Sequence, residues 1–359
     1  MKMGKGLVIA AIAAIVVAGV ATGVVLKSAK TSKTSNAAGV TINGSGSTAV
    51  KNLLDVCIPD YQKATGNTVN YAGIGSGGGR AAFNSGTVDF AFSDAAYGST
   101  ESQPADFVHV PNVAFPVAIE YKLDGFKGTL DLSKTTIAGI FAGKITKWND
   151  PAIDGGKLPA TPITVWYRSD KSGTTGIVTN WLTAVAPSIW NKAGSAGNQT
   201  FTSAFPGSVP EGSFQGANGS DGVSNGVASK DGSIGYSEVS YASERKLGVV
   251  SVENGAGEYV QPTPAGAAAF LNDLTAGAKG TVTVNPLTTA SGAYPISSFS
   301  YGLGYTAGSG KNAAKQASVK GFFTYVLTTC ATDHALDKGY IPVVGKLAAI
   351  ATTNIDLIR

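Results

Sequence analysis

The stretch VNYAGIGSGGGRAAFNSGTVDFAFSD, residues 69–94, contains the pattern that decides the fold of this 359-residue chain. It predicts a strand over Val69–Tyr71, a short helix over Arg80–Ser85 and a second strand over Val88–Ser93, with a glycine-rich turn after the first strand. A strand, a glycine turn, a helix and a strand in this order are typical of a sheet with helices on its faces. The sequence therefore predicts an α/β protein.

The same alternation continues on both sides of this stretch. On its N-terminal side we expect a strand over Val40–Ile42 and a helix over Ser47–Thr65, where apolar residues recur at helical spacing. Residues 194–231 are rich in Gly and Ser and have no clear pattern. The other expected elements are strands over Val113–Tyr121, Ile163–Tyr167 and Ser233–Tyr236, and helices over Leu132–Ala142, Gly173–Val185, Ala265–Thr275 and Val319–Thr328.

The first 39 residues differ from the rest of the chain. Lys2 and Lys5 precede an apolar stretch at residues 7–26, and a segment of Ser, Thr, Lys and Ala follows, which is typical of a flexible tether. A positive start and an apolar core are typical of a secretory signal, but this stretch is also long enough to span a bilayer. We expect residues 1–39 to be a signal peptide or an N-terminal membrane anchor plus a tether, with the folded part outside the cytoplasmic membrane.

The charge of the expected folded part is close to neutral. The whole chain has a formal net charge of +4, but five of its 27 basic residues are lysines within residues 1–39, where no acidic residue occurs. The remainder has 22 basic and 23 acidic residues and no basic run of the kind that binds nucleic acid. An anionic ligand would therefore be held by a few placed groups and not by a general positive field.

The chain has two cysteines, Cys57 and Cys330. In an oxidising compartment a disulfide between them would join the first folded segment to the last, and the alternative is two buried free thiols. The two histidines, His109 and His334, stand in no metal-binding or nucleophile motif. We therefore expect no cofactor, no metal site and no catalytic residue.

Three short sequences combine glycines with hydroxyl residues just before an expected helix. A helix N-terminus has unpaired N–H groups and a partial positive charge, glycine lets the backbone approach an anion, and Ser or Thr adds a donor. Taken singly, each sequence also fits an ordinary cap or turn, and the glycine run lacks the Lys-Ser/Thr of a P-loop. The three are GSGST at Gly44–Thr48, GIGSGGGR at Gly73–Arg80 and RSDKSGTT at Arg168–Thr175.

The third sequence favours an anion site most strongly. Arg168 offers a planar fork of donors suited to a tetrahedral oxyanion, and Asp170 is close enough in sequence to hold it. Ser172, Gly173 and Thr174 then open the expected helix. The alternative is a surface ion pair, but the surrounding hydroxyls and glycines favour binding.

Asp94, at the end of the strand sequence VDFAFSD, is a candidate for selecting the anion. A carboxylate beside an anion is unfavourable unless the anion carries a proton that the carboxylate can accept. Phosphate near neutral pH carries one or two protons and sulfate carries none, so an ionised Asp94 would favour phosphate and repel sulfate. The same residue also fits a cap for the following turn.

From about Thr41 to its end, the chain resembles the periplasmic phosphate-binding proteins of the high-affinity phosphate ABC transporter. The motifs that carry the resemblance, in order, are INGSGST, YQKATGNTVNYAGIGSGGGR, VDFAFSD, IFAGKITKWNDPAI, VWYRSDKSGTT and GSIGYSEVSYA. The resemblance implies an α/β periplasmic-binding-protein fold of type II-like topology, with two lobes that are each a sheet flanked by helices. It implies residues 40–113 and 296–359 in the first lobe, 114–295 in the second, and a hinge near Asn112–Pro116 and Ala293–Ser298.

The resemblance also implies the ligand set. Thr48, Ala49 and Ser76 would bind phosphate from the first lobe, with Asp94 as the acceptor. Arg168, Ser172, Gly173 and Thr174 would bind it from the second lobe, with Asp170 supporting Arg168. The family often has an aromatic residue after the first Thr, whereas this chain has Ala49, so a backbone donor remains and an aromatic wall is lost.

The implied function is delivery of inorganic phosphate to the permease subunits of an ABC transporter by an exported, monomeric protein that binds no nucleic acid. Three alternatives remain open at this point. The ligand could be another tetrahedral oxyanion such as sulfate or molybdate, the protein could be a secreted phosphatase, or phosphate could act on a sensor or adhesion module.

Overall fold

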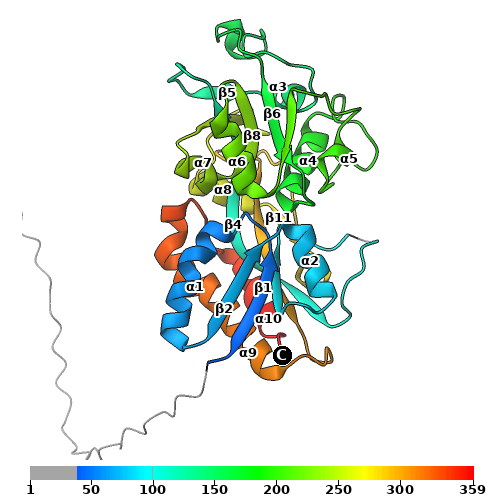
Figure 1. The fold of residues 1–359 in the computed structure, drawn as a ribbon, viewed down its shortest axis with the longest axis vertical. Coiled ribbons are helices and arrows are strands. Elements are labelled where there is room, and N and C mark those ends of the chain that lie inside the picture. The colour runs from blue at the N-terminus through cyan, green and yellow to red at the C-terminus, as the bar shows by residue number, and fades with distance from the viewer. Residues whose placement is uncertain (1–38, 99) are drawn as a thin grey trace, which may run out of the picture. The chain divides into compact units, whose positions relative to one another are not determined.

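The computed structural model describes residues 39–98 and 100–359, so the expected signal or anchor in residues 1–38 lies outside the described residues. The described part is an α/β structure built on one mixed sheet of 11 strands, with helices flanking it (Figure 1). Eight of these strands follow the order β2-β1-β3-β13-β4-β8-β6-β7. None of the helices in the described ranges is long and apolar enough to cross a membrane.

The first lobe combines the N-terminal strands with the C-terminal helices (Figure 1). β1 pairs in parallel with both β2 and β3, and parallel neighbours need a crossover, which the helices α1 and α2 supply. The elements are β1 (Thr41–Gly46), α1 (Lys51–Thr65), β2 (Thr68–Gly73), α2 (Ser76–Asn84), β3 (Phe90–Ser93), β13 (Ser297–Tyr305), α9 (Ala313–Tyr325), the π-helical segment η3 (Val326–Ala335), the 3-10 turn η4 (Leu336–Lys338) and α10 (Gly345–Ile355).

The second lobe is formed by the middle of the chain, and its strand β6 pairs in parallel with β7 and β8. Its elements up to β7 are β5 (Leu130–Leu132), α3 (Lys134–Phe141), the 3-10 turn η1 (Asp154–Gly156), β6 (Thr164–Arg168), α4 (Gly173–Val185), α5 (Phe201–Ala204) and β7 (Phe214–Ala217). The elements that follow are α6 (Gly219–Ser229), β8 (Ser233–Glu238), α7 (Val239–Glu244), β9 (Gly248–Glu253), β10 (Tyr259–Val260) and α8 (Pro264–Leu271).

One long strand, β4 (Phe107–Lys122), belongs to both lobes. Its residues 107–116 pair antiparallel with β13, and Val117–Lys122 pair antiparallel with β8. A second connection lies beside this crossing, because the Val117 N–H donates to the Ile296 carbonyl at 2.8 Å. The chain therefore passes between the lobes at two adjacent points.

Aromatic packing holds β3 against α9 and so fixes the strand end that precedes Asp94. Ring centroids of Phe90 lie 5.6 Å from Phe322 and 5.7 Å from Phe323. Phe92 lies 5.3 Å from Phe323, and all four phenylalanines are fully buried. Each buried ring contributes on the order of 2 kcal/mol through removal of its apolar surface from water.

The glycine-rich run differs from its expected conformation, because it is not a turn before a helix that begins at Arg80. α2 already begins at Ser76, so Gly77 and Gly79 lie in its first turn. A Cβ atom on Gly79 would stand 2.4 Å from the Gly46 Cα, and one on Gly77 would stand 2.6 Å from the Lys171 side chain. The glycines therefore serve close packing of the helix start, which the turn interpretation of the sequence missed.

Two further segments differ from expectation. The unassigned residues 194–231 contain α5, β7 and α6. The expected helix over Ala265–Thr275 ends at Leu271, and the chain continues into β11 (Leu274–Ala276), the turn η2 (Ala278–Gly280) and β12 (Val282–Val284). This hairpin lies against β4 and β13, where the Tyr301 hydroxyl accepts the Val282 N–H at 2.7 Å.

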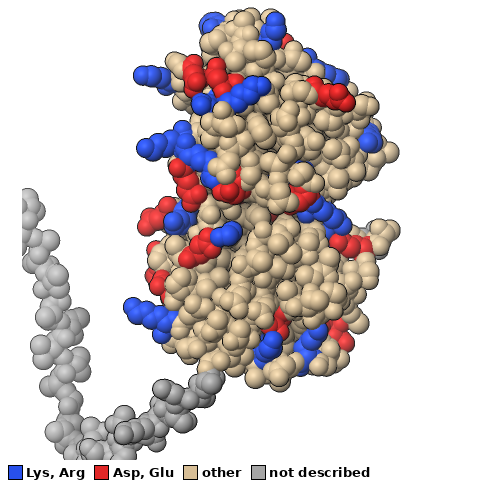
Figure 2. Space-filling view, in the orientation of Figure 1, with Lys and Arg blue, Asp and Glu red and all other residues tan. Residues whose placement is uncertain are grey.

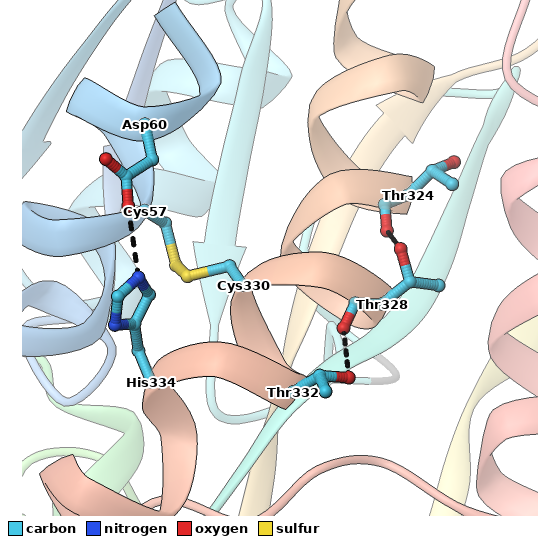
Figure 3. The surroundings of a disulfide bond; sticks show 7 residues. All are labelled: Cys57, Asp60, Thr324, Thr328, Cys330, Thr332 and His334. Atoms are coloured by element: carbon cyan, nitrogen blue, oxygen red, sulfur yellow. Dashed lines mark hydrogen bonds and ion pairs between the residues drawn. A yellow bond between two sulfur atoms is a disulfide. The ribbon is translucent and has the colours of Figure 1, made fainter. Parts of the chain in front are cut away.

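A disulfide joins Cys57 of α1 to Cys330 of η3, as Figure 3 shows. Both residues are fully buried, and their Cα atoms are 5.6 Å apart. Beside the disulfide, His334 Nε2 lies 3.0 Å from Asp60 Oδ2 at the surface (Figure 3). The bond closes a loop of 273 residues and ties the helix that begins next to Thr48 to the C-terminal segment.

Replacing both cysteines, as Cys57→Ala with Cys330→Ala, should lower the free energy of unfolding by about 2–5 kcal/mol, because the crosslink restricts the unfolded chain. Urea denaturation of the two proteins measures the difference. The matched control is Asp60→Asn, which removes only the exposed neighbouring pair and should cost less than about 1 kcal/mol. Equal stability of the double variant and the wild type would contradict this role of the disulfide.

Candidate functional site

The first turns of four helices, α1, α2, α4 and α6, come together between the lobes. The Gly77 N–H at the start of α2 donates to the Lys171 carbonyl, just before α4, at 3.0 Å. The Thr48 hydroxyl before α1 lies 2.9 Å from the Ser220 hydroxyl in the first turn of α6. Helix N-termini carry partial positive charge and free donors, so their convergence produces a site suited to an anion.

Asp94 lies at the centre of one half of this site and is only 6% exposed. Its Oδ2 accepts hydrogen bonds from the hydroxyls of Ser76 and Thr174, each at 3.3 Å. Its Oδ1 is buried without a hydrogen-bond partner among the described residues. The carboxyl therefore joins the start of α2 to the start of α4 and retains an oxygen that can accept a further proton.

Burial raises the pKa of Asp94 above the ordinary value for an aspartate. The hydroxyls of Ser47, Ser300 and Thr174 and the charge of Arg168 act in the opposite direction. A proton on this carboxyl is therefore more stable in the site than it would be in water. This suits a ligand that can share an exchangeable proton with Asp94.

Arg168 is held by Asp170 through two parallel hydrogen bonds. Arg168 Nε donates to Oδ1 at 2.7 Å and Nη2 donates to Oδ2 at 2.5 Å, and the side chains are 2% and 11% exposed. Although burial raises the pKa of Asp170, the hydrogen bond and charge of Arg168 lower it below the usual range. The remaining nitrogen, Nη1, donates to the Ser220 hydroxyl at 3.3 Å, so one arm of the fork points away from the pair.

Two glycines allow the lobes to touch at the site. A Cβ on Gly173 would stand 2.5 Å from Ser76 Oγ and 2.7 Å from Asp94 Cβ. Gly75 has a φ of +82°, and a Cβ there would stand 2.2 Å from Asp170 Oδ2. A larger residue at either position would separate the starts of α2 and α4.

The structure brings together most of the residues expected from the sequence. A continuous chain of contacts runs from Thr48 through Ser220 to Arg168 and Asp170, and Gly173 packs on the group around Asp94. Two other expected residues make different contacts instead. Ser172 caps α4 by accepting the Thr175 N–H at 3.1 Å, and the Ala49 N–H donates to Ser47 Oγ at 3.1 Å.

The sequence interpretation missed α6 and with it Ser220, which is fully buried and contacts both Thr48 and Arg168. The Gly219 N–H before it donates to Asp170 Oδ1 at 3.1 Å. The available signal was Asn218 as a helix cap followed by the apolar pair Val223 and Val227, which both face the core. Four glycines and serines in the first half of the helix obscured this signal.

The face of the molecule shown in Figure 2 is not strongly basic. On the face visible in Figure 2, Lys and Arg alternate with Asp and Glu and do not gather into a single positive patch. Within residues 39–98 and 100–359, no group of three or more His, Cys, Asp or Glu side chains is arranged to hold a metal ion. Anion binding at this site therefore depends on local donors and on Arg168.

Residues 31–329 match the family model of the PBP superfamily domain. The chain is 35% identical over 310 residues to the phosphate-binding protein PstS of Xylella fastidiosa. The matched region covers 85% of this chain and 82% of that protein. The chain belongs to the PstS family of phosphate-binding proteins, within the PBP superfamily.

Solved structures of similar proteins agree with this family and its two-lobed fold. The high-affinity periplasmic phosphate-binding protein PfluDING, bound with phosphate, is 28% identical with a TM-score of 0.66 over 88% of this chain and 93% of that chain. The ancestral soluble variant of the Human Phosphate Binding Protein is 26% identical with a TM-score of 0.68, over 89% of this chain and 98% of that chain.

In the absence of phosphate, Asp94→Asn should raise the free energy of unfolding at pH 7 by about 1–3 kcal/mol, because it removes a buried charge. The folded pKa of Asp94 is raised, so its charge destabilises the protein above that pKa, and the wild type gains stability as pH falls through it toward the unfolded value of about 3.9. The stability difference between the two proteins should therefore shrink on acidification. Urea denaturation between pH 4 and pH 8 measures it, and a variant less stable than the wild type at pH 7 would contradict this account.

Proposed function

We propose that this chain binds one inorganic phosphate ion between its two lobes, outside the cytoplasmic membrane, and delivers it to a phosphate ABC transporter. The observation that carries the proposal is Asp94, a buried carboxyl surrounded by anion-binding donors. A carboxyl in that position favours an anion that brings its own proton. Phosphate has such a proton near neutral pH, and sulfate has none.

The proposed ligand groups come from both lobes. Thr48, the Ala49 N–H and Ser76 donate from the first lobe, and Asp94 accepts the phosphate proton. From the second lobe, Arg168 supplies the charge and Asp170 holds its guanidinium in position. The remaining second-lobe donors are Ser172, Gly173 and Thr174, at the start of α4.

The proposed movement is a closing of the lobes about the two adjacent crossings, near Asn112–Pro116 and Ala293–Ser298. Residues 40–113 and 296–359 form the first lobe in this proposal, and 114–295 form the second, with the hairpin of β11 and β12 packed back on the first. Support comes from the hydrogen bond between the Tyr294 hydroxyl and the Val117 carbonyl at 2.8 Å, which joins the two crossings. Closing expels water and strengthens each hydrogen bond to the ion.

Release then follows from opening of the lobes on docking to the permease subunits of the transporter. The protein acts in this scheme as a monomer that binds stoichiometrically and turns nothing over. Export by the N-terminal segment, cleaved or retained as an anchor, fits the disulfide between Cys57 and Cys330, since such bonds persist in oxidising compartments. The naming of the similar proteins as phosphate-binding proteins supports the same assignment.

Asp94→Asn should reduce the ratio of phosphate affinity to sulfate affinity by at least about tenfold. The amide can donate a hydrogen bond to an unprotonated oxyanion, whereas the carboxylate repels it. Isothermal titration with phosphate and with sulfate at pH 7.5 measures both affinities. The matched control is Asp170→Asn, which frees Arg168 and should weaken both anions without changing the ratio. A ratio that stays the same in Asp94→Asn would exclude Asp94 as the selecting group.

A further inference from the structure

Three tyrosine hydroxyls donate hydrogen bonds to three consecutive backbone carbonyls just before α1. The pairs and their oxygen–oxygen distances are Tyr71 to Ser47 at 2.8 Å, Tyr241 to Thr48 at 2.6 Å and Tyr340 to Ala49 at 2.7 Å. The tyrosines come from β2, from α7 and from the segment between η4 and α10. Three distant parts of the chain thus converge on one short turn.

These phenols are built into the protein as donors. Tyr241 is 2% exposed and Tyr340 is fully buried, while Tyr71 is partly buried. Burial raises the pKa of all three phenols, and for Tyr71 the negative charge of Asp94 raises it further. Each hydroxyl therefore stays protonated and can donate to its carbonyl, and the Thr48 carbonyl accepts the Lys51 N–H at 3.2 Å as well.

Fixing these carbonyls also fixes the N–H groups that follow them. In a planar trans peptide the C=O and the N–H point in opposite directions. Hydrogen bonds to the carbonyls of Ser47, Thr48 and Ala49 therefore orient the N–H groups of residues 48–50 away from the tyrosines. The same bonds hold three partially negative carbonyl oxygens in fixed directions. Without them, rotation of a peptide could turn one of these oxygens toward the anion.

We propose that Tyr71, Tyr241 and Tyr340 are positioning residues for phosphate binding, which set the peptide planes of residues 47–50 so that N–H groups and not carbonyls face the ion. This inference rests on the proposed function. Ala49 is fully buried and has no ring of its own, and the rings around this turn come from other parts of the chain.

Tyr241 has a second consequence, because it belongs to the second lobe while Thr48 belongs to the first. Other hydrogen bonds cross between the lobes near the same turn. Asn52 Nδ2 donates to Ser240 Oγ at 2.8 Å, the Thr48 and Ser220 hydroxyls are bonded to each other, and the Ser220 N–H donates to the Thr48 hydroxyl at 3.2 Å. In the proposed closing movement, the Tyr241 bond is one of the contacts that would form between the lobes. Tyr71 and Tyr340 contact the turn from its own lobe, since Tyr71 lies in β2 and Tyr340 lies between η4 and α10.

The test is a set of single Tyr→Phe variants of the full chain, which keep each ring and remove only the hydroxyl. Tyr241→Phe should weaken phosphate binding about tenfold, mainly through faster release, because the closed form of this variant lacks the whole hydrogen bond between the lobes. Tyr71→Phe and Tyr340→Phe should weaken it about threefold, because their bonds persist in the open protein and act only through the peptide planes. Titration calorimetry gives the affinities, and stopped-flow displacement gives the release rates.

The matched control is Tyr61→Phe. Tyr61 is 3% exposed, and its hydroxyl donates to the Ser318 carbonyl at 3.2 Å within the first lobe, so its removal should leave phosphate affinity unchanged. A purely structural role would lower the melting temperature equally with and without phosphate. A positioning role instead reduces the rise in melting temperature that saturating phosphate produces.

The outcomes separate the two proposals. Wild-type binding of phosphate, with all three variants binding like Tyr61→Phe, would overturn the positioning role and leave the proposed function intact. A wild type that does not bind phosphate would overturn the proposed function and this inference with it. Weakened binding in the three variants with an unchanged control supports the inference.

Discussion

The carboxyl of Asp94 imposes the constraint on which the rest of the site depends. It lies in a water-poor position that raises its pKa and favours its neutral form, whereas the proposed selection of a protonated anion requires its ionised form. Hydroxyls from Ser76 and Thr174 and the charge of Arg168 stabilise the ionised form, and they come from both lobes. Contacts from both lobes therefore oppose the effect of burial on this carboxyl, although its pKa remains raised.

Strand β4 makes this arrangement possible, because it carries one sheet from the first lobe into the second. Helix starts that lie far apart in the chain meet where that sheet changes partners. The folded part has almost no net charge, so attraction of an anion over long distances contributes little, and capture depends on the placed donors. Glycines at positions 75 and 173 allow the backbones to approach closely enough for those donors to meet.

The sequence predicted most of what local patterns encode. The α/β alternation, the helix start at Ser172 and the Arg168–Asp170 pair agree with the structure, because capping residues and short-range charge pairs are visible within a few positions. The helix expected from Ser47 begins later, at Lys51. The sequence did not predict α6, where Gly and Ser outweigh two apolar residues. It also did not predict α10 or the packing of residues 274–284 against β13, since those depend on long-range packing.

The tyrosines around residues 47–49 illustrate the same limit. Tyr71, Tyr241 and Tyr340 are spread over 270 positions and have no spacing that links them, and only the folded chain brings their hydroxyls to one turn. A buried tyrosine in a sequence is ordinarily interpreted as core. Here the hydroxyl, and not the ring, makes the hydrogen bond to the turn before α1 on which the proposed positioning role rests.

The most direct measurement of the central claim is isothermal titration of the wild-type chain with phosphate, alone and in the presence of excess sulfate. The account predicts one phosphate bound per chain, with an affinity that sulfate in hundredfold excess leaves unchanged. Absence of phosphate binding, or competition by sulfate at comparable concentration, would contradict a site in which a buried carboxyl selects a protonated oxyanion.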